Sequence, residues 1–347
     1  MEHDAKVCDK AAVIGLGSWG TAVSGLVARH AEQVVGWVYE REVAEGVNAN
    51  HRNPLYLTGY SLPENVVATN SLTDAVTGAR AIVVVVPSAF LRATVRQMAP
   101  SVAADTPVLV LTKGIEPGTG LLMTDIVAEE LGNPARVACL SGPNHAEEIC
   151  QGKPAAAVIA SADQTVAETF RALFIDQHFR AYVSSDVTGV EVCAAVKNVI
   201  AIACGIARGL ELGDNALSVL MTRGLAEVAR IACAMGGDPM TCMGLAGMGD
   251  LVTTCMSPHS RNGSFGAALV AGETLDEYQA RTHMVVEGAV AALSAHEICE
   301  RLGVEAPVVD AVWSVLYNGS SVRDEMRRML DRLPYEEFYG LAGAFRG

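Results

Sequence analysis

Basic residues are scarce in this sequence. Its 347 residues include 25 Lys and Arg against 39 Asp and Glu, which gives a formal net charge of −14 at pH 7. Surfaces that bind nucleic acid or anionic membranes need clustered Lys and Arg. The composition therefore excludes a nucleic-acid partner, and any anionic substrate has to be met by a few local cations.

Signals for disulfides, metal sites and export are also missing. The nine cysteines form no CxxC pair and the eight histidines are dispersed, which favours reduced thiols over a disulfide framework or a metal site. The first ten residues contain no apolar signal core. The apolar window 187–210 is interrupted by charges and glycines, so it predicts a core helix and not a membrane span. We expect a cytoplasmic protein without membrane insertion or a bound metal.

A glycine motif near the N-terminus predicts nucleotide binding. The apolar run AAVI is followed by GLGSWG and then by the helical pattern TAVSGLVARH. In such a strand, turn and helix, Gly15 permits the tight turn, Gly17 lets the backbone approach a pyrophosphate, and Gly20 lets the helix pack on the strand. Ser18 and Trp19 would be neighbours of the cofactor. The motif predicts a Rossmann-type dinucleotide-binding domain.

The second expected strand, QVVGWVY, leads to the place where such a fold meets the adenosine ribose. Glu40 could accept a hydrogen bond from the ribose 2′-OH of NAD, whereas Arg41 could meet the 2′-phosphate of NADP. Tyr39 ends the strand beside them. The alternative is that these are solvated turn residues, so the choice between NAD and NADP stays open.

Three further apolar runs, AIVVVVP, PVLVLTKG and ARVACL, are typical of parallel strands buried on both faces. Lys113 falls at the carboxyl end of the second, where open α/β sheets bind ligands, although it could be an ordinary solubilising residue. The third run leads into SGPNHAEE, where a turn at Gly142 would present Asn144 and His145. His145 is an acid or base by residue type, but nothing in the sequence orients it.

The strongest catalytic candidate is Lys197. In the window 187–210 only Glu191, Lys197 and Arg208 are charged, which predicts a helix packed on nearly every side. Burial of an ammonium lowers its pKa and suits it to proton transfer near neutral pH. The alternatives are that this lysine reaches the surface or pairs with Glu191.

Polar residues later in the chain could complete such a site. Asp250, in the glycine-rich run GLAGMGDL, could orient the lysine or hold a substrate hydroxyl, or it could cap a helix that begins at Leu251. Ser260, Arg261 and Asn262 precede a helical pattern and combine a guanidinium, two polar side chains and a helix N-terminus. This combination predicts a phosphate-binding site.

The fold prediction follows from the order of these patterns. Strands and helices alternate up to about residue 187, and helical patterns follow without a strand. We predict an α/β protein with a mostly parallel sheet in residues 1–187 and an all-α domain in residues 188–347. The expected helices of the second domain cover residues 187–210, 214–235, 260–271, 287–302 and 306–318.

The chain resembles the bacterial-type NAD(P)-dependent glycerol-3-phosphate dehydrogenases. The resemblance runs through GLGSWG, NPLYLTGYSLPENVVATNSL, TKGIE, SGPNHAEE, VKNVIAIACGIARGLELGDN, GLAGMGDLVTTCMSPHSRN and VVEG, in that order. It implies a helical domain of the 6-phosphogluconate-dehydrogenase type and a homodimer. It also implies reduction of dihydroxyacetone phosphate to sn-glycerol 3-phosphate for phospholipid biosynthesis.

The resemblance also implies roles for individual residues. Lys197 matches the proton donor and acceptor, and Lys113 matches a lysine shared by substrate and cofactor. The matched substrate-binding positions are Lys113, Lys197, Asp250, Ser260, Arg261 and Asn262. Gly142 and Asn144 of the SGPN turn are predicted as further substrate contacts from their place at the strand end. The matched cofactor-binding positions include Ser18, Trp19, Ala146, Arg261, Val285 and Glu287. The sequence departs from the family at Tyr39, often Arg or His, and at Asn144-His145, often Ser-Phe or Thr-Phe.

Two other functions fit the sequence less well. Related two-domain dehydrogenases of 3-hydroxy acids place their lysine in a KxxxN pattern and lack SRN, whereas here Lys197 and Asn198 are adjacent. A non-catalytic NAD(P)-binding sensor would be expected to lose Lys197, Asp250 and Arg261 together. Both differences favour the glycerol-3-phosphate dehydrogenase prediction.

Overall fold

The computed structural model describes residues 6–258, 260–282, 284–333 and 336–341. The chain divides into two compact units, the first made of Met1–Thr112 and Met123–Val187 and the second of Lys113–Leu122 and Thr188–Gly347. The sequence pattern predicts Lys113–Leu122 in the first domain. The structure packs this segment with the helices of the second unit instead.

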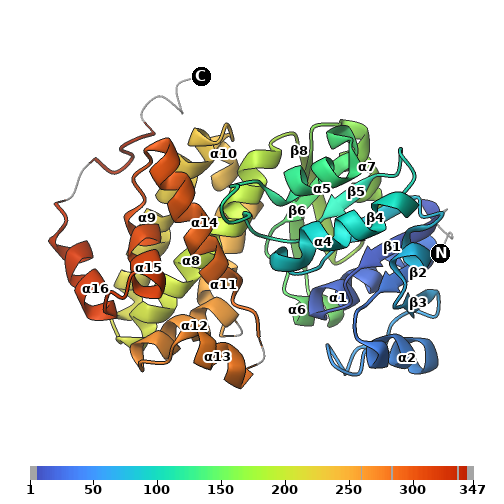
Figure 1. Ribbon diagram of the computed structural model, residues 1–347, viewed down its shortest axis with the longest axis horizontal. Helices are drawn as coiled ribbons and strands as arrows, with labels where there is room; N and C mark the ends of the chain where they lie inside the picture. The colour runs from blue at the N-terminus through green and yellow to red at the C-terminus, as the bar shows by residue number, and fades with distance from the viewer. Residues whose placement is uncertain (1–5, 259, 283, 334–335, 342–347) are drawn as a thin grey trace. The chain divides into compact units, whose positions relative to one another are not determined.

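The first unit is built on one eight-stranded sheet with the order β3-β2-β1-β4-β5-β6-β7-β8 (Figure 1). All neighbouring strands are parallel except β6 and β7, which are antiparallel. This confirms the predicted mostly parallel sheet. The strands are β1 Cys8–Ile14, β2 Ala31–Trp37, β3 Val66–Thr69, β4 Ala81–Val84, β5 Val108–Val110, β6 Val137–Ser141, β7 Ala155–Ser161 and β8 Phe179–Ser184.

Helices connect these strands, and apolar side chains from both fill the core. The helices are α1 Ser18–Val27, α2 Arg41–Asn50, α3 Leu72–Val76, α4 Ser88–Met98, α5 Met123–Leu131, α6 Ala146–Cys150 and α7 Gln164–Phe174, with short 3-10 turns η1 Ala99–Ser101 and η2 Pro134–Arg136. All four residues of β4 are buried, as expected for a parallel strand covered on both faces. The expected end of the second strand at Tyr39 is wrong, because β2 ends at Trp37.

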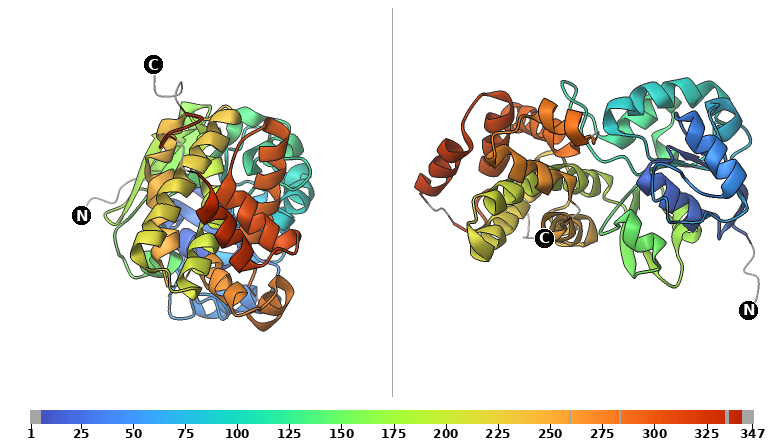
Figure 2. Two further views of the ribbon diagram at one scale, coloured as in Figure 1. Left: turned by 90° about the vertical axis from the view of Figure 1, so that its left-hand side faces the viewer. Right: turned by 90° about the horizontal axis from the view of Figure 1, so that it is seen from below.

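The described part of the second unit is built from helices, as Figure 2 shows from two further sides, apart from the segment Lys113–Leu122, which has an isolated β-bridge between Ile115 and Leu122. Each of the five predicted helices is present, with ends within one residue of the prediction. The helices are α8 Val187–Gly209, α9 Gly213–Ala234, α10 Pro239–Cys242, α11 Asp250–Met256, α12 Arg261–Val270, α13 Leu275–Thr282, α14 Glu287–Leu302, α15 Pro307–Tyr317 and α16 Val322–Asp331, with a π-helical turn η3 Leu245–Gly249.

Helix α8 is the central helix of this unit. It is long and apolar enough to cross a membrane, but 89% of its most apolar window is buried inside the protein. The prediction of a core helix is therefore confirmed. A Cβ added to Gly205 would lie 2.1 Å from the carbonyl oxygen of Gly263, and one added to Gly266 would lie 2.2 Å from that of Ile202. Helices α8 and α12 thus touch through their backbones, which fixes the start of α12 beside α8.

Candidate active site

Lys197 is held inside the second unit by two hydrogen bonds. Its side chain is 7% exposed, and its Nζ donates to Asp250 Oδ1 and to Thr254 Oγ1, each at 2.6 Å. The lysine therefore neither reaches the surface nor takes Glu191 as the partner of its ammonium. Burial lowers the pKa of Lys197 to about 8, with the positive charge of Lys113 adding to this and Asp250 opposing it.

The carboxylate of Asp250 accepts hydrogen bonds from two lysines. Asp250 is 3% exposed, and its second oxygen, Oδ2, accepts a hydrogen bond from Lys113 Nζ at 2.8 Å. Burial alone would raise the pKa of Asp250, but the two ammonium groups hold it below its ordinary value. The cluster of Lys113, Lys197 and Asp250 carries one net positive charge when both lysines are protonated, so it would attract an anion.

The local sequence explains how Asp250 reaches this position. The turn η3 ends at Gly249, and Asp250 is the first residue of α11, so the alternative of a cap for a helix starting at Leu251 is wrong. A Cβ on Gly247 would lie 2.1 Å from the carbonyl oxygen of Cys242, which shows how tightly η3 packs on the end of α10. Thr254 lies one turn after Asp250 on the same face of α11. Thr254 is not among the residues predicted from the sequence, and its spacing of four residues from Asp250 is the one signal that points to it.

A second group of hydrogen bonds fixes the start of α12. Ser260 caps the helix, and its Oγ accepts a hydrogen bond from the backbone N–H of Gly263 at 3.2 Å. Asn262 Nδ2 donates to Asn198 Oδ1 at 2.9 Å, and Asn262 Oδ1 accepts from the Gly288 backbone N–H at 3.0 Å. Asn198, the neighbour of Lys197, was not predicted as a site residue. The network locks α8, α12 and α14 together beside the lysine.

Arg261 and the start of α14 complete the predicted residues of this unit. Arg261 is exposed, and its guanidinium donates to the carbonyl oxygen of Val285 at 3.4 Å. Glu287 is the first residue of α14, one position before Gly288. The structure thus brings Lys113, Lys197 and Asp250 into contact, and it joins Arg261 to the segment before α14.

In the first unit, the glycine turn has the shape that a dinucleotide needs. Gly15 has a φ of 110°, in the region that favours glycine, and a Cβ on Gly20 would lie 1.7 Å from the Gly15 carbonyl oxygen. A Cβ on Gly17 would project into open space, and no side chain caps the helix that follows. The turn therefore leaves the amide end of α1 open to a phosphate group, which fits a bound dinucleotide.

Six buried polar side-chain atoms of this unit have no hydrogen-bond partner within the described protein, and three of them belong to predicted site residues or their neighbours: Trp19 Nε1, Asn144 Nδ2 and His145 Nε2. Trp19 lies in α1, while Asn144 and His145 precede α6, which packs against α1 and begins at Ala146. Buried polar atoms normally have partners. A polar ligand in this region would supply them, so these residues also fit a nucleotide.

The remaining predicted residues of the first unit have different surroundings. A Cβ on Gly142 would lie 2.7 Å from the Cα of Ala157, so this glycine permits close packing. Tyr39 is 85% exposed. Glu40 accepts a hydrogen bond from Tyr56 Oη at 3.3 Å, and Arg41 pairs with a glutamate one turn further along α2.

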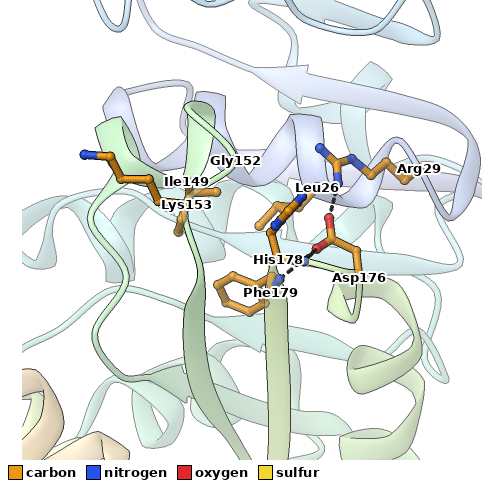
Figure 3. A pocket seen from close by; sticks show the side chains of 8 residues that line it. All are labelled: Leu26, Arg29, Ile149, Gly152, Lys153, Asp176, His178 and Phe179. Atoms are coloured by element: carbon orange, nitrogen blue, oxygen red, sulfur yellow. Dashed lines mark hydrogen bonds and ion pairs between the residues drawn. The ribbon is translucent and has the colours of Figure 1, made fainter.

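A small pocket lies at the far end of α1 from the glycine turn (Figure 3). Arg29 and Asp176 form an ion pair there, and Asp176 Oδ1 accepts the backbone N–H groups of His178 and Phe179 at 2.6 and 2.7 Å. The cavity of about 10 Å³ has room for a single water molecule. We therefore assign no ligand to it.

Comparison with known proteins gives consistent matches along the chain. The family model described as NAD-dependent glycerol-3-phosphate dehydrogenase N-terminus matches residues 10–167, and the corresponding C-terminus model matches residues 186–343. A protein of Streptomyces griseus named glycerol-3-phosphate dehydrogenase [NAD(P)+] is 45% identical over 324 residues, which are 93% of this chain and 96% of the relative. One of Nocardia farcinica with the same name is 45% identical over 330 residues, with 93% and 98% covered.

The solved structures agree with these matches. The crystal structure of glycerol-3-phosphate dehydrogenase from Coxiella burnetii has a TM-score of 0.89 and 35% identity, covering 94% of this chain and all of that one. A ketopantoate reductase from Ralstonia eutropha has a TM-score of 0.58 and 17% identity, covering 92% of this chain and 99% of that one, a likeness of fold alone.

Proposed function

The chain belongs to the NAD-dependent glycerol-3-phosphate dehydrogenase family, and from this we propose that it reduces dihydroxyacetone phosphate to sn-glycerol 3-phosphate with Lys197 as the proton donor. It is an oxidoreductase that uses NAD or NADP. The observation that carries the catalytic assignment is the buried ammonium of Lys197, with its pKa lowered to about 8 beside Asp250 and Lys113.

The proposed roles of Lys197 and Lys113 follow from the chemistry of ketone reduction. The reduced nicotinamide supplies the hydride, and the ketone oxygen then needs a proton. An ammonium has three N–H donors, and Asp250 and Thr254 accept two of them from Lys197. The third donates to the ketone oxygen. Lys113 stabilises the negative charge that develops on this oxygen and helps keep the pKa of Lys197 low.

The phosphate of the substrate is assigned to the start of α12. Ser260, Arg261 and Asn262 supply a hydroxyl, a guanidinium and an amide at a helix N-terminus, a combination suited to a phosphate. Gly142 and Asn144 are further proposed substrate positions. A phosphate held away from the reacting carbon orients the ketone, so its loss should lower turnover as well as affinity.

The proposed cofactor site uses the glycine turn and the open start of α1. The proposed contacts are Gly15, Gly17, Ser18, Trp19, Gly20, Tyr39, Glu40, Arg41, Lys113, Ala146, Arg261, Val285 and Glu287. A 2′-phosphate would compete with Glu45 for Arg41, whereas Glu40 can accept from a ribose hydroxyl at no such cost. Dinucleotide binding is assigned to residues 1–187 and substrate binding to residues 188–347, with Lys113 and Arg261 proposed to contact both ligands.

The wider role follows from the family. We propose that the enzyme acts in the cytoplasm as a homodimer and supplies sn-glycerol 3-phosphate for phospholipid biosynthesis. The nine cysteines of the sequence form no CxxC pair, a pattern that favours reduced thiols and agrees with a reducing compartment.

The test is the initial rate of NADH and NADPH oxidation with dihydroxyacetone phosphate, unphosphorylated dihydroxyacetone and a 2-oxo acid. We expect turnover only with the phosphorylated ketone. The ratio of the rates with NADH and NADPH gives the cofactor preference. Lys197→Ala should lower kcat at least about a hundredfold. Lys153→Ala, which removes a lysine that is half-exposed, is the matched control and should keep normal kcat. Turnover of the oxo acid instead, or a normal kcat for the folded Lys197 variant, would refute the assignment.

A further inference from the structure

Two thiols of the second unit are in contact close to the lysine cluster. The Sγ atoms of Cys193 and Cys242 are 3.4 Å apart, and both residues are 1% exposed. Cys193 lies on α8, one helical turn before Lys197, and Cys242 is the last residue of α10. The pair therefore connects the helix of the proposed proton donor to a segment 49 residues away.

The backbone after Cys242 leads directly to Asp250. The turn η3 packs so closely on Cys242 that a Cβ on Gly247 would lie 2.1 Å from the Cys242 carbonyl oxygen. Asp250 follows Gly247 after two residues and accepts the hydrogen bond of Lys197. A displacement of Cys242 would therefore be transmitted to the carboxylate, while a displacement of Cys193 would be transmitted along α8 to the ammonium.

We propose that Cys193 and Cys242 form an oxidation site, at which a hydroperoxide converts the two thiols into an intramolecular disulfide. The Cys242 thiolate attacks a peroxide oxygen, the O–O bond breaks, and a sulfenic acid and an alcohol form, or water when the oxidant is hydrogen peroxide. The Cys193 sulfur then attacks the sulfenic sulfur and water leaves. Each sulfur loses one electron, the peroxide gains two, and the two thiol protons end in the released alcohol and water.

The position of Cys242 provides a route for the oxidant. It belongs to a helix of four residues, and its neighbours Met240 and Met243 are each 60% exposed. So short a helix opens locally at low cost, which brings the thiol to solvent without unfolding the unit. Cys193 lies in the long buried helix and acts second, as the resolving thiol.

Formation of the disulfide shortens the distance between the sulfur atoms of Cys193 and Cys242. Its S–S bond is about 2.05 Å long, so the two sulfurs have to approach by more than 1 Å from their contact in the reduced protein. Because interiors are close-packed, the backbones of α8 and α10 share this movement. On the proposed function, displacement of Lys197 or Asp250 by this amount lowers kcat about tenfold or more. The oxidised enzyme is then a slow form that a thiol reductant restores.

The experiment treats the folded, full-length enzyme with hydrogen peroxide, blocks remaining thiols and maps cross-linked peptides by mass spectrometry. We expect a peptide pair linked through Cys193 and Cys242, a parallel fall in kcat, and recovery of both on reduction. Cys242→Ser and, separately, Cys193→Ser should abolish the link and the fall in kcat. Cys233→Ser, at a half-buried thiol of α9, is the matched control and should respond like the parent protein.

Several results would overturn the proposal. If the half-buried thiols are oxidised and Cys193 and Cys242 are still not linked, the proposed oxidation site is refuted. A link between Cys204 and Cys255 in its place would move the oxidation to another hydrogen-bonded pair of thiols, in which Cys204 lies about three turns after Cys193 on α8 and Cys255 lies on α11. A complete Cys193–Cys242 link with unchanged kcat would refute the coupling to Lys197. Failure of the reduced enzyme to use dihydroxyacetone phosphate would refute the proposed function alone, because peptide mapping needs no activity.

Discussion

Replacement of Asp250 by asparagine tests the electrostatics of the lysine cluster. The substitution keeps the shape of the side chain but removes the charge that lies 2.6 Å from Lys197 Nζ and 2.8 Å from Lys113 Nζ. Two ammonium groups would then share a buried region without a counter-charge, which favours loss of a proton. We expect the pKa of Lys197 to fall below its value of about 8 in the parent enzyme.

The size of this change can be worked from the geometry. With an effective dielectric constant of about 20, opposite unit charges 2.6 Å apart attract by roughly 6 kcal/mol. The asparagine dipole and entering water recover part of this, so about 3 kcal/mol, or about two pKa units, is a conservative loss. The pKa of Lys197 would then lie near 6, and near pH 7 the ammonium fraction would fall from about nine-tenths to about one-tenth.

The assay is kcat for dihydroxyacetone phosphate reduction as a function of pH. In the proposed mechanism, reduction needs the protonated lysine. We therefore expect kcat to fall above about pH 8 in the parent enzyme, and we expect this fall to begin about two pH units lower in Asp250→Asn. The same mechanism needs the neutral lysine for oxidation of glycerol 3-phosphate, so the rate of oxidation should rise over the same range. Glu129→Gln removes the carboxylate of an exposed ion pair with Arg92 and should leave both profiles unchanged. If kcat for reduction by Asp250→Asn still falls only above about pH 8, the proposed effect of Asp250 on the pKa of Lys197 is refuted.

Three further changes test other parts of the molecule. Arg261→Ala should raise KM for dihydroxyacetone phosphate much more than it weakens NAD(P)H binding measured by fluorescence titration; equal losses would contradict a main role of Arg261 in holding the phosphate. Gly205→Val should lower the free energy of unfolding in a urea titration by about 1–3 kcal/mol or more, because its Cβ would overlap Gly263, whereas an unchanged midpoint would contradict the close helix contact. Burial raises the pKa of Glu227 to about 7, so the stability that it contributes is complete below about pH 4.5 and is lost as pH rises through 7. Glu227→Gln should flatten this loss in thermal melts, and an unaltered slope would assign it to another group.

The sequence was most informative where one element dominates its surroundings. The long helix α8 could be predicted because its apolar residues occupy every face, and Lys197 stood out as the charge that such a helix cannot easily accommodate. The five predicted helices of the second unit carried enough periodic pattern to set their ends. Helices α10, α13 and α16 were not predicted, and α10 and α13, with four and eight residues, are too short to show a helical period clearly.

The contacts of the site could not be read in the same way. Lys113 and Asp250 are 137 residues apart, and nothing near either one indicates that they meet. Thr254 was missed because a threonine within a helix has no distinctive pattern, although it accepts a hydrogen bond from Lys197. Strand β8 was missed because three of its six residues are exposed, so it lacks the continuous apolar run that marked the strands of the sheet centre.

The segment Lys113–Leu122 has a consequence for the order of synthesis. Its side chains Ile115 and Leu122 are buried in the core of the second unit, and the carbonyl oxygen of Ile115 accepts a hydrogen bond from Ser294, 179 residues later. At about 5–20 residues per second, the ribosome needs roughly 10 to 40 s to make the chain between them. During that time the apolar side chains of Ile115 and Leu122 have no helices of the second unit to pack against. If the chain were divided after residue 187 and the two pieces were made separately, the C-terminal piece would lack Lys113–Leu122. It would therefore lack both this part of its core and Lys113.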